Sequence, residues 1–318
     1  MKIALALNGN LRTFFMPLRE NPNLRVCDFF IKNIIEPNQD CDIFICCGLT
    51  DFFMDGKVFY INNTIETINN NGFRVYNNIE FIDKEIAKIM ISKKLNETFK
   101  NIKSLIFAED NYQKHPNYLK MKNCGFFGVS TELLINQHNK ILILKESIEK
   151  SNIKYDYIIR SRFDFILNIK PLSNYNIQKN NVYCNGFEGD RDLIYDWYAF
   201  GDSETILKCM DLYNQLDFIN PLYVLRCNNC GIKFIKEKNS CIHGITPGDV
   251  TLSSETQLAR LLKNNNFLAT NSHINGFLYR YKSDNTSETL EDVLPKNLKH
   301  IKIIDYTATG EVFVTEYK

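Results

Sequence analysis

The sequence predicts an α/β fold with a mixed, mainly parallel central sheet flanked by helices. The chain opens strand, helix, strand: short β-rich apolar runs at 2–8 and 42–48 enclose a helix candidate at 27–37, which Pro37 ends. Such a unit forms a parallel, right-handed strand pair. The run at 155–167 is apolar on both faces when it is read with a period of two, as in a central buried strand. A chain of 318 residues, 44% of them hydrophobic, is long enough for a large core.

The middle of the chain supplies the next elements. A strand is expected at 74–82, and residues 84–122 read as helical and then irregular, covering one side of the sheet. A helix is expected at 130–150, with Ser130 as its cap. Its apolar stripe has helical spacing and consists of Leu134, Ile141, Leu144 and Ile148, with His138 on the same side. We interpret His138 as a hydrogen-bonded core histidine, with a catalytic role as the alternative.

The last part of the chain alternates strands and helices. Strands are expected at 181–187, 273–282 and 298–306. The helix that follows the segment WYAFG would be capped by Asp202 or Ser203. Another helix, in SETQLARLLKNN, would be capped by Ser253 or Ser254.

Composition excludes several classes of protein. A formal charge of +1 leaves no excess of cations for a general nucleic-acid binder. No apolar run approaches the roughly 20 residues of a transmembrane helix. The opening MKIALALNGN has a short apolar run that ends at Asn8 without a cleavage-like site, so it reads as a first strand rather than a signal peptide. We therefore expect one cytoplasmic domain over 1–318, with no transmembrane segment.

The ten cysteines are expected to be reduced thiols, because no secretory signal is recognised. Cys46 and Cys47 lie in the apolar run DIFICC and read as small core residues. A second group offers the ligand types of a tetrahedral structural zinc site and consists of Cys227, Cys230, Cys241 and His243. The alternative is a loop with unliganded thiols.

The first strand ends in a segment suited to a ligand. In open α/β sheets, ligands bind beyond the carboxyl ends of parallel strands. Asn8 and Gly9 lie at that end, where a glycine permits close approach to the backbone, and Arg12 offers a fork suited to phosphate oxygens. The alternative is an ordinary Asn-Gly turn.

The strand 155–167 places Arg160, Arg162 and Asp164 on one face. Buried guanidiniums keep their charge and need anionic partners, and this face provides two cations but one nearby carboxylate. A diphosphate would balance the surplus charge, while Asp164 could hold a divalent metal ion or a sugar hydroxyl. The alternative is a structural ion network completed by carboxylates from elsewhere in the chain.

Four blocks resemble those of small GT-A-type glycosyltransferases of surface-polysaccharide and glycan synthesis: KIALALNGNLRTF, YDYIIRSRFDF, YDWYAFGDSETI and SSETQLARLL. The resemblance implies a GT-A-like, Rossmann-like fold, with a nucleotide-sugar-binding half at 1–170 and an acceptor-side half at 171–318. It implies a nucleotide-diphosphate sugar as donor and a glycan, lipid-linked or protein-linked acceptor. The nucleotide pocket would be lined by Asn8, Gly9 and Arg12. The R-x-R-x-D strand takes the place of an Asp-x-Asp motif and would neutralise the leaving diphosphate.

The strand departs from an Asp-x-Asp motif because it holds one aspartate. One interpretation is therefore that Asp164 holds a Mn²⁺ or Mg²⁺ ion. The other is that Arg160 and Arg162 supply the positive charge that such an ion would provide to the diphosphate. The second choice for a metal site is the pair Asp190 and Asp192 in the polar stretch FEGDRD.

Three acids match positions in the resembling blocks: Asp196, Asp249 in TPGDV, and Glu255. Two of them, Asp196 and Glu255, are candidates for catalysis together with Asp164. Asp196, beside Trp197 and Tyr198, is assigned to sugar binding. Glu255 is the candidate base for the acceptor hydroxyl, with compensation of the helix dipole as its alternative role. Inverting and retaining transfer both stay open.

Two other functions remain as alternatives. A metal-dependent nucleotidyltransferase would use a similar nucleotide pocket but would show paired carboxylates on the central strand. A zinc-stabilised, non-catalytic interaction protein would bind stoichiometric zinc and no nucleotide.

Overall fold

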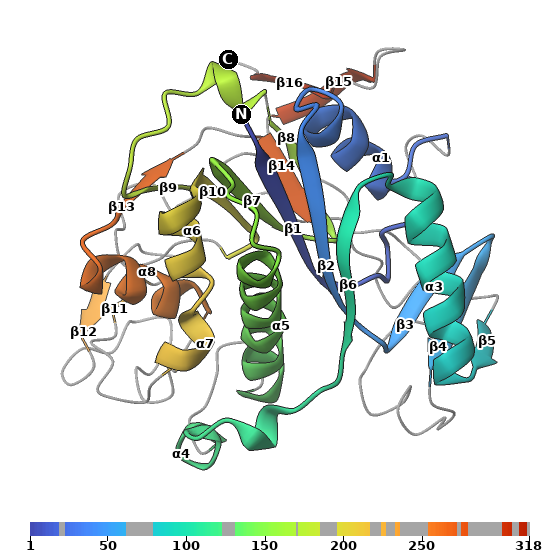
Figure 1. The fold of residues 1–318 in the computed structure, drawn as a ribbon, viewed down its shortest axis with the longest axis horizontal. Coiled ribbons are helices and arrows are strands. Elements are labelled where there is room, and N and C mark those ends of the chain that lie inside the picture. The colour runs from blue at the N-terminus through green and yellow to red at the C-terminus, as the bar shows by residue number, and fades with distance from the viewer. Residues whose placement is uncertain are drawn as a thin grey trace.

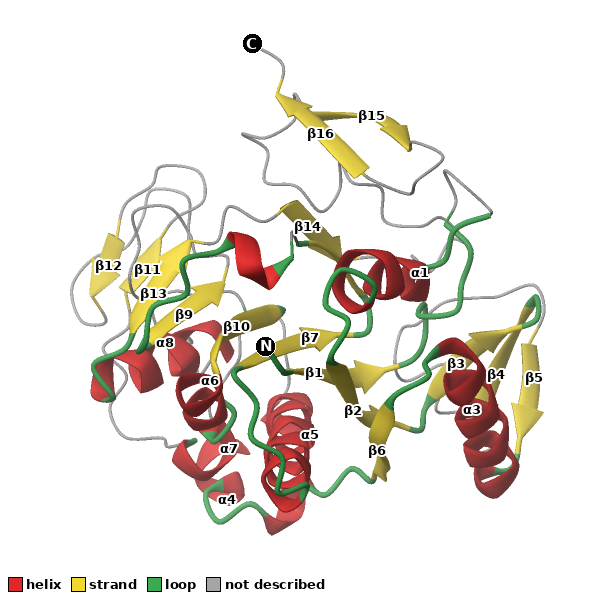
Figure 2. Cartoon of the chain, turned by 45° about the horizontal axis from the view of Figure 1, so that its top comes forward, coloured by secondary structure: helices red, strands yellow, loops and turns green. Residues whose placement is uncertain are grey.

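The structure is a computed structural model, and its fold is drawn in Figures 1 and 2. It describes residues 1–18, 23–61, 79–122, 131–169, 171–184, 196–216, 224–226, 233–235, 254–271, 275–278, 301–306 and 312–316. The strand Asn181–Cys184 is the described part of the strand predicted at 181–187, and the helix Ser254–Asn264 corresponds to the one predicted in SETQLARLLKNN.

A seven-stranded sheet forms the centre of the described part, in the order β13-β9-β10-β7-β1-β2-β6. Its strands are β1 (Ile3–Asn10), β2 (Cys41–Gly48), β6 (Ile102–Ala108), β7 (Tyr157–Arg162), β9 (Asn181–Cys184), β10 (Tyr198–Asp202) and β13 (Leu268–Asn271). β10 is antiparallel to both of its neighbours, and every other pair is parallel. The prediction of a mixed, mainly parallel sheet is confirmed.

Helices cover both faces of this sheet (Figure 1). One face packs against α1 (Val26–Phe30) and α3 (Lys84–Thr98), whose buried residues share a core cluster with Leu5 and Leu7 of β1. The other face packs against α5 (Thr131–Lys150), α6 (Ser203–Cys209) and α8 (Ser254–Asn264), which share a cluster with Ala4 and Ala6. The chain is therefore wound on both sides of its sheet.

The winding reverses between β1 and β7. From β1 the chain passes through α1 to β2 and later to β6, all on one side of β1. Helix α5 then carries it back to β7, which pairs with the other edge of β1. This topological switch point is where open α/β sheets bind ligands, beyond the carboxyl ends of the strands.

Local chemistry explains several element ends. Asp83 caps α3, with its Oδ1 accepting from the backbone N–H of Glu85 at 2.7 Å. Asp202, one of the two predicted caps, caps α6 by accepting from the N–H of Thr205 at 3.0 Å. The predicted helix at 27–37 is α1 followed by a π-helical turn (Ile31–Ile35), and it ends before Pro37.

Smaller elements surround the sheet. The short helices are a 3₁₀ turn (Tyr112–Lys114), α4 (Tyr118–Lys122), a second 3₁₀ turn (Leu172–Asn174) and α7 (Leu212–Gln215). A three-stranded sheet contains β3 (Asp51–Met54), β4 (Lys57–Ile61) and β5 (Ile79–Ile82). The remaining pairs are β8 (Phe165–Asn168) with β14 (Asn275–Leu278), β11 (Val224–Arg226) with β12 (Lys233–Ile235), and β15 (Ile301–Tyr306) with β16 (Val312–Glu316).

Two predictions about strands were wrong. The run 155–167 is not one strand: β7 ends at Arg162, a turn follows, and β8 pairs with β14 outside the main sheet. The apolar alternation continues across this turn without Gly or Pro, so a period of two gives no sign of it. The segment after α3 was expected to be irregular, yet Ile102–Ala108 forms β6 at the edge of the main sheet.

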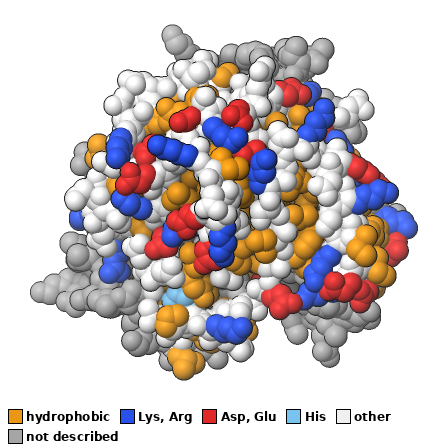
Figure 3. All heavy atoms as spheres, viewed as in Figure 1, with side chains coloured by type: hydrophobic (Ala, Val, Ile, Leu, Met, Phe, Trp, Pro, Cys, Tyr) orange, Lys and Arg blue, Asp and Glu red, His pale blue; other side chains and the backbone are white. Residues whose placement is uncertain are grey.

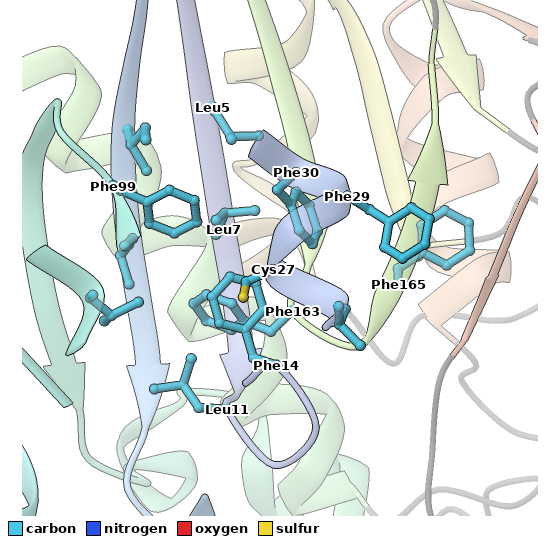
Figure 4. Packing of buried hydrophobic residues seen from close by; sticks show 14 of the residues in the cluster. Leu5, Leu7, Leu11, Phe14, Cys27, Phe29, Phe30, Phe99, Phe163 and Phe165 are labelled. Atoms are coloured by element: carbon cyan, nitrogen blue, oxygen red, sulfur yellow. The ribbon is translucent and has the colours of Figure 1, made fainter. Parts of the chain in front are cut away.

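Aromatic rings fill the core on the α1 side (Figure 4). Phe14 contacts Phe163 at the end of β7 edge to face, with centroids 4.9 Å apart. It also packs against Phe30 of α1 and Phe99 beyond α3. This packing fixes the chain where β7 turns out of the sheet, and so it supports the carboxyl end of β1 as well.

The surface has mixed charge. On the face shown in Figure 3, cationic and anionic side chains are interspersed rather than separated into patches, in keeping with the formal charge of +1. None of the helices in the described part combines the length and apolar character needed to cross a bilayer.

Candidate functional site

The carboxyl ends of β1 and β7 meet at the switch point. Asn8 of β1 is the register partner of Arg162 of β7, and the N–H of Phe163 donates to the carbonyl of Asn8 at 3.2 Å. Gly9 has a φ of +120°, a conformation that glycine adopts without strain. The structure therefore brings Asn8, Gly9 and the end of the arginine strand together, and their role in binding a ligand remains a prediction.

Asn8 has an unusual side chain. It is 1% exposed, and neither its Oδ1 nor its Nδ2 has a hydrogen-bond partner among the described residues. A buried amide without partners costs about 1–3 kcal/mol. The four buried side-chain atoms in the described part that lack a partner are these two, Nη1 of Arg160 and Nδ1 of His138. All four belong to the layer between the sheet and α5.

Arg162 and Asp164 form a bidentate ion pair. Nε of Arg162 donates to Oδ1 of Asp164 and Nη2 donates to Oδ2, both at 2.8 Å. The two side chains are 21% and 18% exposed, so the pair lies at the mouth of the site. The turn after β7 allows Asp164 to fold back on Arg162, although the sequence placed both residues on one strand face.

Arg160 is held more deeply, with 5% of its surface exposed. Its Nη2 donates to the backbone carbonyl of Asp196 at 2.7 Å, and the Asp196 carboxylate interacts with it electrostatically. Asp196 is thus a second carboxylate beside the two arginines, which the sequence could not place there. Two cations and two carboxylates balance, so the surplus positive charge expected from the strand alone is absent from this set.

Asp196 is buried, with 4% of its surface exposed, and its carboxylate has a hydrogen-bond partner on α5. Oδ2 accepts a short hydrogen bond from Nε2 of Gln137. Burial alone would raise the pKa of Asp196, but the charges of Arg162 and Arg160 and the nearby hydroxyl of Ser254 lower it below its ordinary value. Asp196 therefore stays ionised. Its assignment to sugar binding remains a prediction.

His138 lies beside this carboxylate and is 2% exposed. Its Nε2 is 2.8 Å from the Oγ of Ser254. Burial lowers the pKa of His138 to about 4, so the ring is neutral at neutral pH. This confirms the reading of His138 as a hydrogen-bonded core histidine.

Arg12 has a protein partner. Its Nε donates to Oδ1 of Asp51 at 2.6 Å, and the hydroxyl of Thr50 donates to the same oxygen at 2.7 Å. Asp51 follows β2, so this pair bridges the ends of β1 and β2. The role of Arg12 in holding phosphate remains a prediction.

The sequence reasoning missed three side chains in this layer: Gln137, Ser254 and Lys140. Lys140 of α5 is 6% exposed, pairs with Asp110 at 3.3 Å and lies against Gly48 of β2. Asn10 crowds the same glycine, so a Cβ at this position would displace polar side chains. The sequence indicated Ser254 only as a candidate helix cap. For Gln137 and Lys140, a polar residue on a predicted helix does not reveal which side chain it will contact.

Metal-ligand candidates are mostly outside the described residues. Asp190, Asp192, Cys227, Cys230, Cys241 and His243 all lie there. So does the side chain of Glu255, whose backbone is in the first turn of α8. Within the described part, no three His, Cys, Asp or Glu side chains form a metal-binding group. Asp164 offers a single carboxylate, which suits Mg²⁺ shared with ligand phosphates better than a closed protein cage.

The cysteines in the described part are structural. Cys27, Cys41, Cys46, Cys47, Cys184 and Cys209 are free and buried. Burial raises the pKa of Cys46 to about 12, so it is an inert thiol rather than a nucleophile. Cys46 and Cys47 are core residues, as expected.

No protein-family model matches the sequence, and no curated protein matches it. Among solved structures, the chain is similar to mouse xyloside xylosyltransferase 1 in its apo form, with 10% identity, a TM-score of 0.28, and coverage of 67% of this chain and 71% of that one. It is also similar to an active-site mutant of LgtC, with 11% identity, a TM-score of 0.27, and coverage of 69% and 66%. Likenesses this weak support no functional conclusion by themselves.

Proposed function

We propose that the protein is a glycosyltransferase that binds a nucleotide-diphosphate sugar at the switch point between β1 and β7 and transfers the sugar to a hydroxyl acceptor. The observation that supports this best is the buried Asn8 amide, without partners in the described part, beside the Arg162–Asp164 pair at a ligand-binding edge. The four sequence blocks that resemble GT-A-type enzymes add the chemical class of the ligand.

In this proposal Asn8 supplies one donor and one acceptor to the donor ligand. Gly9 lets the ligand approach the backbone at the strand end. Arg162 offers its fork to a phosphate, since guanidinium matches phosphate oxygens bidentately. Residues 1–170 would bind the donor, and residues 171–318 would form the acceptor side, with Glu255 as the candidate base.

The charge balance bears on metal dependence. Arg162 and Asp164 neutralise each other, so a phosphate bound by the Arg162 fork would compete with Asp164 for this guanidinium. A diphosphate bound with a divalent ion brings an anion for Arg162 and a cation for Asp164. One ion pair would then be replaced by two. Such an ion would be held by Asp164 and the donor phosphates, and it would supply positive charge to the leaving diphosphate. We therefore favour Mn²⁺ or Mg²⁺ dependence over arginines alone.

A thermal-shift screen tests this proposal. Purified protein is heated with UDP, GDP, CDP and their common sugar conjugates, with Mn²⁺ or with EDTA. A ligand at 100 times its Kd stabilises the folded protein by about 2.7 kcal/mol. We expect one nucleotide family to raise the melting temperature with Mn²⁺, and EDTA to remove most of the shift.

The matched variants are Arg162→Ala and Arg25→Ala. Arg25 also pairs with an aspartate, since its Nη2 donates to Asp28 at 2.8 Å, but it precedes α1 on the other face of the sheet. Arg162→Ala should abolish the nucleotide shift, and Arg25→Ala should keep it. If no nucleotide stabilises the folded wild type, the transferase proposal is wrong, and the arginine strand is a structural ion network.

A further inference from the structure

Lys140 of α5 is a buried cation at the ligand-binding edge of the sheet, and the proposed function does not use it. Its side chain is 8% exposed, although lysine is rarely buried this far without a partner. In the described part its carboxylate partner is Asp110, whose Oδ1 lies 3.3 Å from Nζ. An ammonium has three N–H donors, so this single contact leaves it able to bind a further acceptor.

The ammonium lies at the carboxyl end of β2. A Cβ built on Gly48, the last residue of β2, would come 3.0 Å from Cε and 3.5 Å from Nζ of Lys140. The missing side chain of Gly48 therefore provides the space that Lys140 occupies. Asp110 follows the end of β6, which is paired with β2, so the ion pair lies where both strands end.

Lys140 lies over the same face of the sheet as Asn8. Side chains alternate between the two faces along a strand. Ala6 of β1 belongs to the core cluster under α5, so Asn8 and Asn10, at the next two alternate positions, face α5 as well. The Asn10 side chain approaches Gly48 from β1, as Lys140 approaches it from α5.

Asn8 therefore has a cation on each side. Arg162 belongs to β7, the neighbour of β1 on one side, and Lys140 lies over the end of β2, the neighbour on the other. Neighbouring strands are about 4.8 Å apart, so β7 and β2 are about 10 Å apart. A diphosphate lying across the end of β1 would be within reach of long side chains from both sides.

The two cations differ in how firmly their carboxylates are held. In the bidentate pair of Arg162 and Asp164 both side chains are largely buried, so a phosphate meets a strong competitor there. Asp110 is 52% exposed and makes a single contact with Lys140. When a phosphate takes its place, this carboxylate returns to water at little cost, because ion pairs with an exposed partner contribute little stability.

We propose that Lys140 is a phosphate-binding residue of the switch-point site, and that Asp110 pairs with it until a phosphate replaces the carboxylate. A diphosphate suits this position because it is anionic and accepts hydrogen bonds, whereas an ammonium only donates them. This exchange requires no metal ion, in contrast to the one favoured at Arg162. The inference deepens the proposed function and rests on it for the identity of the diphosphate, but binding of an anion by Lys140 can be tested separately.

Opposite effects of two variants are the main test. Calorimetry measures Kd for the nucleotide that stabilises the wild type, with Mn²⁺, and for inorganic pyrophosphate, with EDTA. Lys140→Met removes the charge from a side chain of similar length and should raise both Kd values about 10- to 100-fold, because a charge-assisted hydrogen bond is lost. Asp110→Asn removes the competing carboxylate and should lower both Kd values about 1.5- to 5-fold.

A purely structural ion pair would behave differently. The two variants would then change the Kd values in the same direction or leave them unchanged, and either result would overturn the inference. The matched control is the pair of Lys145 and Asp211, whose Nζ and Oδ1 are 3.1 Å apart. Lys145 is on the same helix, which runs from the ligand-binding edge toward the start of β7, so it lies further from that edge. Lys145→Met and Asp211→Asn should leave both Kd values unchanged.

Gly48→Ala serves if Lys140→Met does not fold. The added Cβ would meet Cε of Lys140 at 3.0 Å and should shift the ammonium without changing any charge, so both Kd values should rise. If pyrophosphate binds through Lys140 and no nucleotide binds, the anion site is real and only the transferase proposal fails. If a nucleotide binds and Lys140→Met leaves its Kd unchanged, the transferase proposal stands and this inference fails. If neither binds the wild type, both are wrong.

Discussion

Replacing Asn8 by leucine should stabilise the protein and, at the same time, abolish ligand binding. The amide is 1% exposed and neither of its polar atoms has a partner in the described part. In the absence of ligand, folding removes this amide from water without a compensating hydrogen bond. Leucine has a similar branched shape and no polar atom, so the folded state no longer bears that cost.

The size of the effect follows from the desolvation of one amide. Mutational data place that cost at about 1–3 kcal/mol. With about 2.1 cal/mol/K of unfolding entropy per residue, 318 residues give about 0.7 kcal/mol/K. The free energy gained therefore corresponds to a rise in melting temperature of about 1.5–4.5 °C.

Asn38 is the matched control. It is 4% exposed, but its Nδ2 donates to the carbonyl of Ile34 at 2.6 Å and its Oδ1 accepts from the N–H of Leu172 at 3.2 Å. Asn38→Leu leaves these two backbone groups unpaired and should lower the melting temperature by at least as much as Asn8→Leu raises it.

The assay is thermal unfolding of the three proteins, repeated with the nucleotide that stabilises the wild type. Asn8→Leu should melt higher than the wild type without nucleotide and should not respond to nucleotide. A lower melting temperature for Asn8→Leu would show that the amide is satisfied in the free protein, for example by buried water, and would refute the reasoning. A nucleotide shift equal to that of the wild type would remove Asn8 from the binding site.

Two further predictions concern stability. Burial lowers the pKa of His138 from 6.5 to about 4, so between these pH values the unfolded chain binds a proton that the folded chain does not. The free energy of unfolding should therefore fall by up to ~3 kcal/mol as pH drops from about 6.5 to 4. Urea titrations at several pH values should show a smaller fall for His138→Gln than for the wild type. An equal fall in the two proteins would contradict this assignment. Gly201→Ala should lower stability by about 1–3 kcal/mol in the same titrations, because its Cβ would lie 2.6 Å from the backbone carbonyl of Asn181. An unchanged urea midpoint would mean that β9 can move away from the added Cβ of residue 201 at little cost.

Local signals were enough to predict the frame of the fold. The strand pair β1 and β2 and the helix α5 follow from hydrophobic periodicity, which depends only on neighbouring residues. The cap at Asp202 is equally local. The turn after Arg162 is not local in this sense, because it depends on the pairing of β8 with β14, more than 100 residues away. Periodicity gives no information about such a partner.

The candidate site shows the same division. Asn8, Gly9, Arg160 and Arg162 were predicted because they occupy strand ends and strand faces that the sequence makes visible. The position of Asp196 was not, since it comes from a segment beyond β9, where its carboxylate is held by Gln137 of α5 and its carbonyl by Arg160. Pairing in space, rather than residue type, decides which charges balance.

That balance changes where function should be sought. Two arginines on one strand suggest a missing anion, yet Asp164 and Asp196 supply both charges from within the chain. Charged groups that satisfy one another need no ligand to explain them. A buried amide with no partner does need an explanation, because the fold gives up free energy to keep it. For this reason the proposed ligand site at the switch point rests on Asn8 more than on the arginines that first drew attention.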